Sequence, residues 1–177
     1  MNIPTRDKCL ELLKEYNLSE KKIHHSILVA DVALFLAKKL IEKGEKIDLR
    51  LVEAGALLHD IAKSESYTGD SHSKDGEEIV KRFGFEKLMP IIRKHELSGI
   101  LEYRFDTWEE KLVYYADKRA RNEIRSIDER TKKWPELFPE FKEKIFQSVT
   151  KAKELEKEIF SKLDFKPEDL KELIKVN

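Results

Sequence analysis

The stretch AGALLHDIAK, residues 54–63, sets an imidazole and a carboxylate side by side in a segment that is otherwise apolar. The residues before the His59–Asp60 pair are apolar nearly all around a helical wheel, and two more apolar residues follow it. A charged carboxylate buried there is costly unless a cation or hydrogen-bond donors compensate it. Lys63 could be that cation. A metal ion is an equal candidate, because imidazole and carboxylate are both natural metal ligands.

Two other polar residues stand where apolar helical faces end. Asp117 follows the apolar run LVYYA and precedes a basic segment, so an ion pair with Lys118 or Arg121 would account for it without any functional site. His25 lies at the edge of another apolar surface, where a single hydrogen bond would satisfy it. If the three faces pack on one core, however, His25, Asp117 and the His–Asp pair converge. Such a set makes a metal site with room for water.

The whole chain has the pattern of an all-α protein. No segment alternates with period two for long enough to predict a strand, and residues 64–74 have loop composition. The expected helices are residues 5–16, a long second helix capped by Ser19 and ended by Gly44, a third capped by Asp48 and running to residue 63, short helices near 75–83 and 87–96, a sixth opened by Asp106 or Thr107, one begun by the capping-box sequence SIDE at 126–129, a long one near 139–163 and a short one after Pro167.

Length and composition narrow the class of protein. A chain of 177 residues is most simply one domain with a substantial core. Lys plus Arg and Asp plus Glu are each 35, so no basic bias indicates nucleic-acid binding. No apolar run reaches the length of a membrane span, and the N-terminal residues lack the apolar core of a signal peptide. The single cysteine, Cys9, lies among leucines and is expected to pack in the core. These features favour a cytoplasmic protein.

The order H…HD…D, carried by His25, the His59–Asp60 pair and Asp117, resembles the HD superfamily of metal-dependent phosphohydrolases. The local contexts are similar too. HSILVADVA resembles the family's first helix, LLHDIAK its usual LLHDIGK, and YYADK the segment around its closing aspartate. HSKDG, which begins at His72, resembles its H-x-x-x-G segment, and IIRKHE contains its next histidine. The similarity covers about residues 19–122.

The resemblance implies a single domain over residues 1–177, an HD-type helical bundle whose metal-binding core is about 19–122. Additional C-terminal helices would form an extension at about 136–177. It also implies that one divalent metal is held by His25, His59, Asp60 and Asp117. In members with six ligands two further histidines bind a second ion and the Asp of the pair bridges both. His72 and His95 occupy the matching positions here, whereas His24 lies outside the pattern and is expected to be a structural or a surface histidine.

The chemistry implied is phosphate-ester or phosphoanhydride hydrolysis. Two ions would lower the pKa of a bridging water and make hydroxide available for attack on phosphorus. Asp60 and Lys63 are the expected catalytic residues, and Lys63, Arg119 and Arg121 are the expected phosphate-binding residues. Mixed imidazole and carboxylate ligation suits iron or manganese, and zinc is also compatible.

The substrate is left as a small phosphorylated molecule, with a nucleotide as the leading expectation. No GYP triplet follows His95, unlike the cyclic di-guanylate phosphodiesterases, and IAKSE after the His–Asp pair differs from guanosine tetraphosphate hydrolases. The six-ligand pattern in a small domain resembles bacterial symmetrical diadenosine tetraphosphatases, although the segment after Asp117 does not. The expectation therefore stops at a phosphomonoester or a nucleotide phosphoanhydride.

One alternative is a metal-binding domain without catalysis, serving as a regulatory or interaction module. Its expected mark, a missing ligand, is absent from the sequence. Another is an interaction protein that works through the segment FPEFKEKIFQSVTKAKELEKEIFSKLDF, residues 138–165, which carries an apolar stripe. That stripe is expected to pack on its own domain, but if exposed it would favour a homodimer.

Overall fold

The computed structural model describes residues 2–69 and 71–174, so residue 70 of the expected loop and the last three residues of the expected C-terminal extension lie outside it. Within the described ranges no strand forms, which confirms the all-α prediction. The elements are α1 (Arg6–Glu15), α2 (Glu20–Glu42), α3 (Leu49–Leu58), α4 (His72–Arg82), the 3₁₀ turn η1 (Glu86–Leu88), α5 (Met89–Lys94), α6 (Gly99–Glu102), α7 (Trp108–Arg119), α8 (Ile127–Thr131), α9 (Trp134–Leu137), η2 (Pro139–Phe141), α10 (Lys142–Phe160), η3 (Pro167–Asp169) and α11 (Leu170–Leu173).

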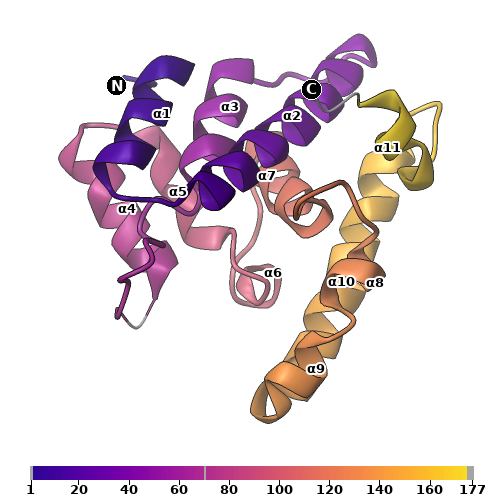
Figure 1. The fold of residues 1–177 in the computed structure, drawn as a ribbon. Helices are drawn as coiled ribbons and strands as arrows, with labels where there is room; N and C mark the ends of the chain where they lie inside the picture. The colour runs from indigo at the N-terminus through magenta and orange to yellow at the C-terminus, as the bar shows by residue number, and fades with distance from the viewer. Residues whose placement is uncertain (1, 70, 175–177) are drawn as a thin grey trace.

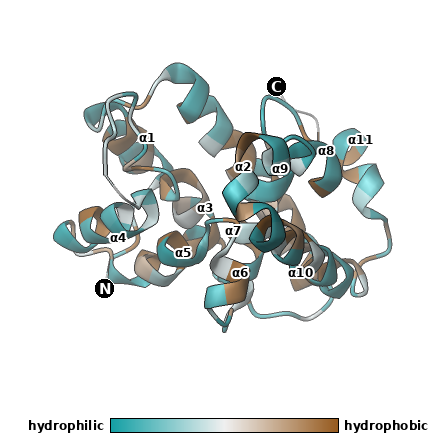
Figure 2. Ribbon diagram, turned by 90° about the horizontal axis from the view of Figure 1, so that it is seen from below, coloured by the Kyte–Doolittle hydropathy of each residue, from teal (hydrophilic) through white to brown (hydrophobic). Residues whose placement is uncertain are grey.

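The centre of the fold is formed by α2, α3 and α7, which pack on one another and are covered by the other helices (Figure 1). Each of the three is apolar on more than one face, and side chains such as Leu36, Leu57 and Tyr115 are completely buried. Burying one such side chain stabilises the fold by about 1.5–3 kcal/mol. Figure 2 shows hydrophobic stretches gathered where the helices meet, with hydrophilic residues turned outward. The apolar faces that the sequence predicts are therefore the ones that hold these helices together.

Helix α3 ends at Leu58, five residues before the end that its apolar pattern predicts. The ring Nδ1 of His59 lies 2.7 Å from the carbonyl of Ala56, an oxygen that Asp60 N–H would otherwise use in a continuing helix. Tighter turns follow, with Ile61 N–H donating to Leu58 O at 3.1 Å. Adjacent positions in a regular helix do not share a face. The break therefore lets His59 and Asp60 face the same centre.

Helix α4 begins at His72 and not at residue 75, so His72 belongs to a helix and not to the expected loop. The Ser71 hydroxyl caps it by accepting from Lys74 N–H. Gly76 lies one turn further on, where an added Cβ would come within 3.0 Å of Ile92 Cγ2 and 3.6 Å of Ile61 Cγ2. The missing side chain at Gly76 thus allows α4 to lie close against α5 and against the turn that follows α3.

Capping sites elsewhere agree well with the sequence. Asp48 caps α3 and Thr107 caps α7 through their side chains, and the SIDE segment forms the expected capping box at the start of α8. Ser19 precedes α2, but its hydroxyl donates to Glu65 at 2.9 Å and makes no cap bond. Helices α6 and α9, each four residues long, were not expected.

The C-terminal part forms an arm of α8, α9 and α10 that extends away from the central helices (Figure 1). Its tip exposes four large apolar side chains, by 48% to 64% of their surface: Leu137, Phe138, Phe141 and Phe146. The inner part of α10 buries Ala152, Leu155 and Ile159 against the central helices. The stripe is therefore covered near the body and exposed at the tip. In the part of the chain that is described, no helix combines the length and apolarity needed to cross a membrane.

Candidate metal centre

Six side chains from five segments meet at one place beside α3. His25 comes from α2, His59 and Asp60 from the turn after α3, His72 from the start of α4, His95 from the end of α5, and Asp117 from α7. These are the six residues that the sequence points to as metal ligands. Their assignment as ligands remains a prediction. The distances between their nitrogen and oxygen atoms can be compared with those expected around a metal ion.

One group of potential ligand atoms is formed by His25, His59 and Asp60, which all lie within 4.8 Å of one another. Asp117 joins this group through Oδ1, which is 3.1 Å from His25 Nε2 and 3.6 Å from His59 Nε2. Two ligands at right angles and each about 2.2 Å from one ion would be about 3.1 Å apart. These separations therefore suit a common ion.

A second group is formed by Asp60, His72 and His95, again within 4.8 Å. Asp60 Oδ1 lies 3.1 Å from His95 Nε2 and 3.3 Å from His72 Nε2. The other oxygen, Oδ2, lies 3.6 Å from His59 Nε2 in the first group. Asp60 is thus shared, with one carboxylate oxygen directed to each group.

Two backbone carbonyls fix which ring nitrogens point into the centre. His59 Nδ1 lies 2.7 Å from Ala56 O, and His95 Nδ1 lies 2.6 Å from Ile92 O. A carbonyl can only accept, so Nδ1 carries the proton in both rings. In the neutral ring Nε2 is then a bare lone pair, and it faces carboxylate oxygens that also hold only lone pairs. An arrangement of this kind requires a cation, and orientation of a ligating histidine by a carbonyl is common at metal sites.

The burial of these atoms supports the same conclusion. His59 is completely buried, and within the described residues its Nε2 has no hydrogen-bond partner. Burial lowers the pKa of His95, which disfavours a proton as the compensating cation there. At His59 burial also acts to lower the pKa, but Asp60 and Asp117 outweigh it and raise the pKa above its ordinary value. A proton is thus favoured at His59 but disfavoured at His95, so protonation of the rings does not account for the whole cluster, and the donor set fits divalent metal ions.

Both carboxylates are held in the charged form. Burial acts to raise the pKa of Asp60, but the nearby His59, His72 and His95 lower it well below its ordinary value. Burial likewise opposes ionisation of Asp117, where Lys118 is the largest compensating influence. Charged carboxylates are the form that binds metal.

Lys118 also belongs to this centre, although the sequence predicts it only as an ion-pair partner of Asp117 at the surface. The expected ion pair with Asp117 exists, but Lys118 is 3% exposed, so the pair is buried. Its ammonium also donates to the carbonyl of His95 at 2.8 Å and lies 4.9 Å from the ring centroid of Tyr114. One lysine thereby joins Asp117 to the backbone of a histidine in the other group.

The three basic residues expected to bind phosphate have different positions. Lys63 Nζ lies 3.5 Å from Asp60 Oδ2 and its side chain is 45% exposed. Arg121 is exposed and lines a cavity of about 350 Å³ together with His25, Asp60 and Lys63. Both are therefore next to the candidate metal centre.

Arg119 is not. Its guanidinium donates to Glu156 at 3.0 Å, to Pro167 O at 2.9 Å, and to Tyr115 and the Arg125 carbonyl. It is 3% exposed and joins α7 to the C-terminal arm. The expectation that Arg119 binds phosphate is therefore not supported by its surroundings. The sequence could not separate Arg119 from Arg121, because the helix that contains one ends before the other.

Sequence reasoning also missed two basic residues beside the centre. Lys22 lines the same cavity, and its ammonium donates to the carbonyl of Lys63 at 2.7 Å. Arg130, from α8, lines it too and donates through Nε to Ala120 O at 3.0 Å. No local pattern distinguishes either from the many other lysines and arginines. Lys22 does lie three residues before His25, close to one turn of helix, which was the one available signal.

Comparison with known proteins agrees with the helical bundle and its His/Asp cluster. The model of the HD domain family matches residues 23–122, which include all six candidate ligands. The chain therefore belongs to the HD domain family.

The chain is 36% identical over 124 residues to an uncharacterised protein of Methanocaldococcus jannaschii, MJ0778, covering 63% of this chain and 72% of that protein. It is also 34% identical over 128 residues to proteins of Thermoplasma volcanium and Picrophilus torridus, each named tRNA (cytidine(56)-2'-O)-methyltransferase. Those alignments cover 65% of this chain but only 36% of each methyltransferase. No solved structure matches the chain.

Proposed function

We propose that this protein is a metal-dependent phosphohydrolase that cleaves a phosphomonoester or a nucleotide phosphoanhydride. The observation that carries the proposal is the position of Asp60, whose two oxygens face two different groups of imidazole nitrogens. A carboxylate shared in this way suits a pair of divalent ions. Membership of the HD domain family, which is generally hydrolytic, supports the reaction class.

The residues that would hold the ions are His25, His59, Asp60 and Asp117 on one side, and Asp60, His72 and His95 on the other. Iron or manganese suits this mixture of imidazole and carboxylate, and zinc is compatible with it. When bound, divalent ions supply a water of lowered pKa and positive charge for the phosphoryl oxygens.

The residues at the mouth of the centre would bind the substrate phosphate. Lys63 projects a half-exposed ammonium beside Asp60, where it can donate to a phosphoryl oxygen. Lys22 holds the Lys63 backbone in place through its bond to the carbonyl. Arg121 adds an exposed guanidinium to the lining of the same cavity, suited to a second oxygen of the same phosphate. These basic side chains thus bind and orient the phosphate. The buried carboxylates of Asp60 and Asp117 balance the positive charge of the metal ions.

The methyltransferase activity named for two relatives is not part of the proposal. Most of the length of those proteins lies outside their alignment with this chain, and a cluster of buried histidines and aspartates is suited to metal chemistry. Because their names refer to tRNA, an RNA is one further substrate to test, and a terminal phosphate gives it the phosphomonoester that the proposed reaction needs.

The experiment is a panel of substrates run with Mn²⁺, Fe²⁺ or Zn²⁺ added to the metal-free protein. The panel contains an aryl phosphate, nucleoside mono- and polyphosphates, a dinucleoside polyphosphate and a short RNA with a terminal phosphate. We expect phosphate release from at least one of them, dependent on added metal. If the metal-loaded wild type cleaves none, the alternative of a non-catalytic metal-binding regulatory module is favoured instead.

Asp60→Ala tests the observation that carries the proposal. Because both groups share this carboxylate, the variant should lose turnover and bind neither ion, while the metal-free protein should be no less stable, since a costly buried charge is removed. Asp31→Ala is the control, because Asp31 is a half-buried carboxylate of α2 that pairs only loosely with Arg6, at 4.0 Å. Wild-type turnover in Asp60→Ala would show that the mechanism is wrong.

Lys63→Ala should weaken turnover and leave the metal content unchanged, because Lys63 lies at the mouth and is not a ligand. Lys74→Ala removes the same charge from an exposed position on α4 and should change neither quantity.

A further inference from the structure

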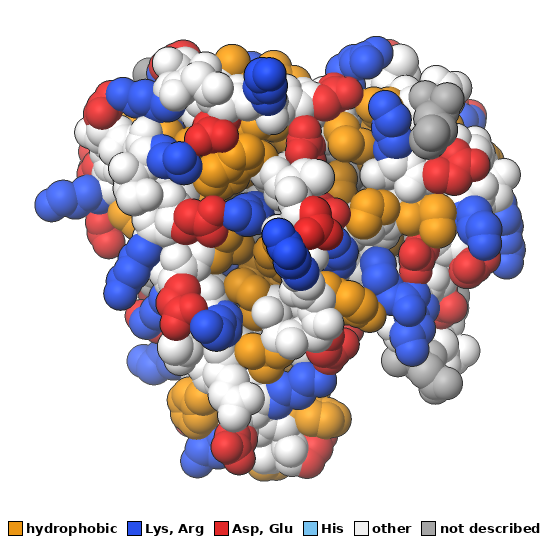
Figure 3. All heavy atoms as spheres, turned by 180° about the vertical axis from the view of Figure 1, so that it is seen from behind, with side chains coloured by type: hydrophobic (Ala, Val, Ile, Leu, Met, Phe, Trp, Pro, Cys, Tyr) orange, Lys and Arg blue, Asp and Glu red, His pale blue; other side chains and the backbone are white. Residues whose placement is uncertain are grey.

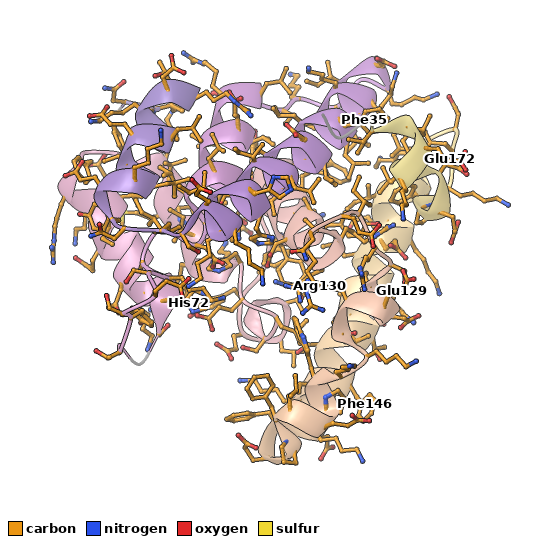
Figure 4. All side chains as sticks on the ribbon, viewed as in Figure 1. Phe35, His72, Glu129, Arg130, Phe146 and Glu172 are labelled. Atoms are coloured by element: carbon orange, nitrogen blue, oxygen red, sulfur yellow. The ribbon has the colours of Figure 1, made fainter. Side chains whose placement is uncertain are left out.

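A second cavity adjoins the one over the candidate metal centre. It has a volume of about 370 Å³ and is bounded by the segment after α7, by α8 and by the start of α9. Arg121 and Arg130 line both cavities, so the two are neighbours separated by two arginine side chains. Figure 4 shows Arg130 projecting from α8 toward the central helices, whereas Glu129 projects to the other side. The second cavity therefore lies where the arm meets the body.

The lining of this second cavity is strongly basic. Five cationic residues contribute to it: Arg121, Arg125, Arg130, Lys132 and Lys133. Glu129 also lines it, but that carboxylate already accepts from the backbone and hydroxyl of Ser126 at 2.8 and 2.9 Å in the capping box of α8. On the face drawn in Figure 3, by contrast, acidic and basic side chains are interspersed. Positive charge therefore exceeds negative charge along the second cavity, next to the candidate metal centre.

Arg125 lines the second cavity and has one buried nitrogen without a hydrogen-bond partner among the described residues. Its terminal nitrogen pairs with Glu123 at 3.0 Å, but its Nε is buried and has no hydrogen-bond partner among the described residues. Because that nitrogen is buried, Arg125 contributes to the cavity mainly through its positive charge.

Arg130 connects the second cavity to the metal centre. Its Nε donates to Ala120 O, which uses one of its five N–H donors, and its guanidinium lies 5.1 Å from the ring centroid of Trp134. Arg130 also lines the cavity over the candidate metal centre, together with His25 and Asp60. An anion bound where the two cavities meet would therefore contact an arginine that also borders the candidate metal centre.

We propose that the second cavity binds the distal phosphates of a substrate whose reacting phosphate lies at the metal centre. The substrate class is then a phosphoanhydride with at least two linked phosphates, and a simple phosphomonoester would leave the second cavity unused. This inference rests on the proposed hydrolase function, since only that function places a reacting phosphate beside His25 and Asp60.

The test is a binding measurement on metal-free protein, which does not depend on turnover. Inorganic tripolyphosphate and inorganic phosphate are titrated into the wild type by calorimetry in the presence of a chelator. The variant is Lys132→Ala combined with Lys133→Ala, two exposed lysines of the second cavity. The control is Lys142→Ala combined with Lys157→Ala, which removes two exposed lysines of α10 and changes the net charge equally.

We expect the Lys132→Ala, Lys133→Ala variant to raise the Kd for tripolyphosphate by about tenfold, because two charge-assisted contacts are lost. The same variant should change the Kd for inorganic phosphate by less than about twofold. The control should change both by less than about twofold. Equal effects of the two variants, or equal effects on the two anions, would overturn the proposal. Failure of the substrate panel with this binding pattern intact would instead count against the hydrolase alone.

Discussion

At the scale of single residues, His59 shows most clearly how the fold and the candidate site are connected. The ring is completely buried, one nitrogen is bonded to Ala56 O, and the other has no hydrogen-bond partner within the described residues. A buried polar atom without a partner costs about 1–3 kcal/mol. The sequence already points to this residue, since a His–Asp pair in an apolar segment is unusual. It could not show that both members face one centre.

Metal content is the first prediction at this scale. His72→Ala should reduce the content from about two ions per chain to about one, because His72 contacts only the second group. His24→Ala is the matched control, since His24 is an exposed histidine of α2 adjacent to a candidate ligand. Elemental analysis after anaerobic purification without chelator measures both. Equal metal content in wild type and His72→Ala would remove His72 from the ligand set.

Acidification provides a second prediction. Imidazoles bind metal only when Nε2 is free of a proton, so protons compete with the ions. The carboxylates around His59 raise its pKa above the ordinary value, so protonation begins to displace metal from the first group as the pH falls from neutrality. Protein dialysed at pH 5.5 should therefore retain less metal than protein dialysed at pH 7.5, with the helical circular dichroism unchanged. Constant metal content over this range would exclude histidine ligation.

At the scale of elements, the positions of helices were more predictable than their ends. The cap residues Asp48 and Thr107 are visible in the sequence because capping is a local interaction. The end of α3 was predicted wrongly because its apolar pattern continues past the point where His59 bonds to the backbone. The start of α4 was missed for a similar reason, since polar loop-like residues surround His72. In both cases a site residue interrupts the regular pattern.

The glycine of α4 carries a testable consequence. Gly76→Val would place side-chain atoms against Ile92 and Ile61, so it should destabilise the protein by about 1–3 kcal/mol and move His72 out of the second group. Glu78→Val is the control, because it also introduces a valine but on the exposed face of the same helix. It should lower the free energy of unfolding by less than about 1 kcal/mol. Urea unfolding and metal content measure the two effects. Unchanged stability and metal content in Gly76→Val would show that this close approach is unimportant.

At the scale of the whole molecule, the arm is attached to the body through a small polar network. Glu156 of α10 accepts from Tyr115 at 2.6 Å and from the buried Arg119 at 3.0 Å, so α7 is joined to the arm just after it contributes Asp117. The sequence predicts the long helix but not this contact, because nothing local shows that Arg119 turns away from the centre. The expected homodimer stays a prediction, and the exposed tip around Phe146 is where such a contact would form (Figure 4).

Glu156→Gln should weaken this attachment, because it leaves the buried guanidinium of Arg119 without its carboxylate. We expect a loss of about 3 kcal/mol in the free energy of unfolding. Glu158→Gln, two residues along the same helix, breaks a more exposed pair with Lys111 and should cost no more than about 1 kcal/mol. Denaturant titration of both variants makes the comparison. Similar losses in the two would show that the Arg119 network does not hold the arm.

Because Asp60 is shared between two groups, substitutions at different residues of this centre have unequal effects on metal binding. A change at His72 or His25 touches one group and leaves the other with its own nitrogen ligands, so the loss is graded. A change at Asp60 removes an oxygen from both groups at once, so the loss is complete. Under the proposed two-ion assignment, natural variants of this fold would therefore pass from two ions to one through a single histidine change, whereas a change at Asp60 would offer no such intermediate.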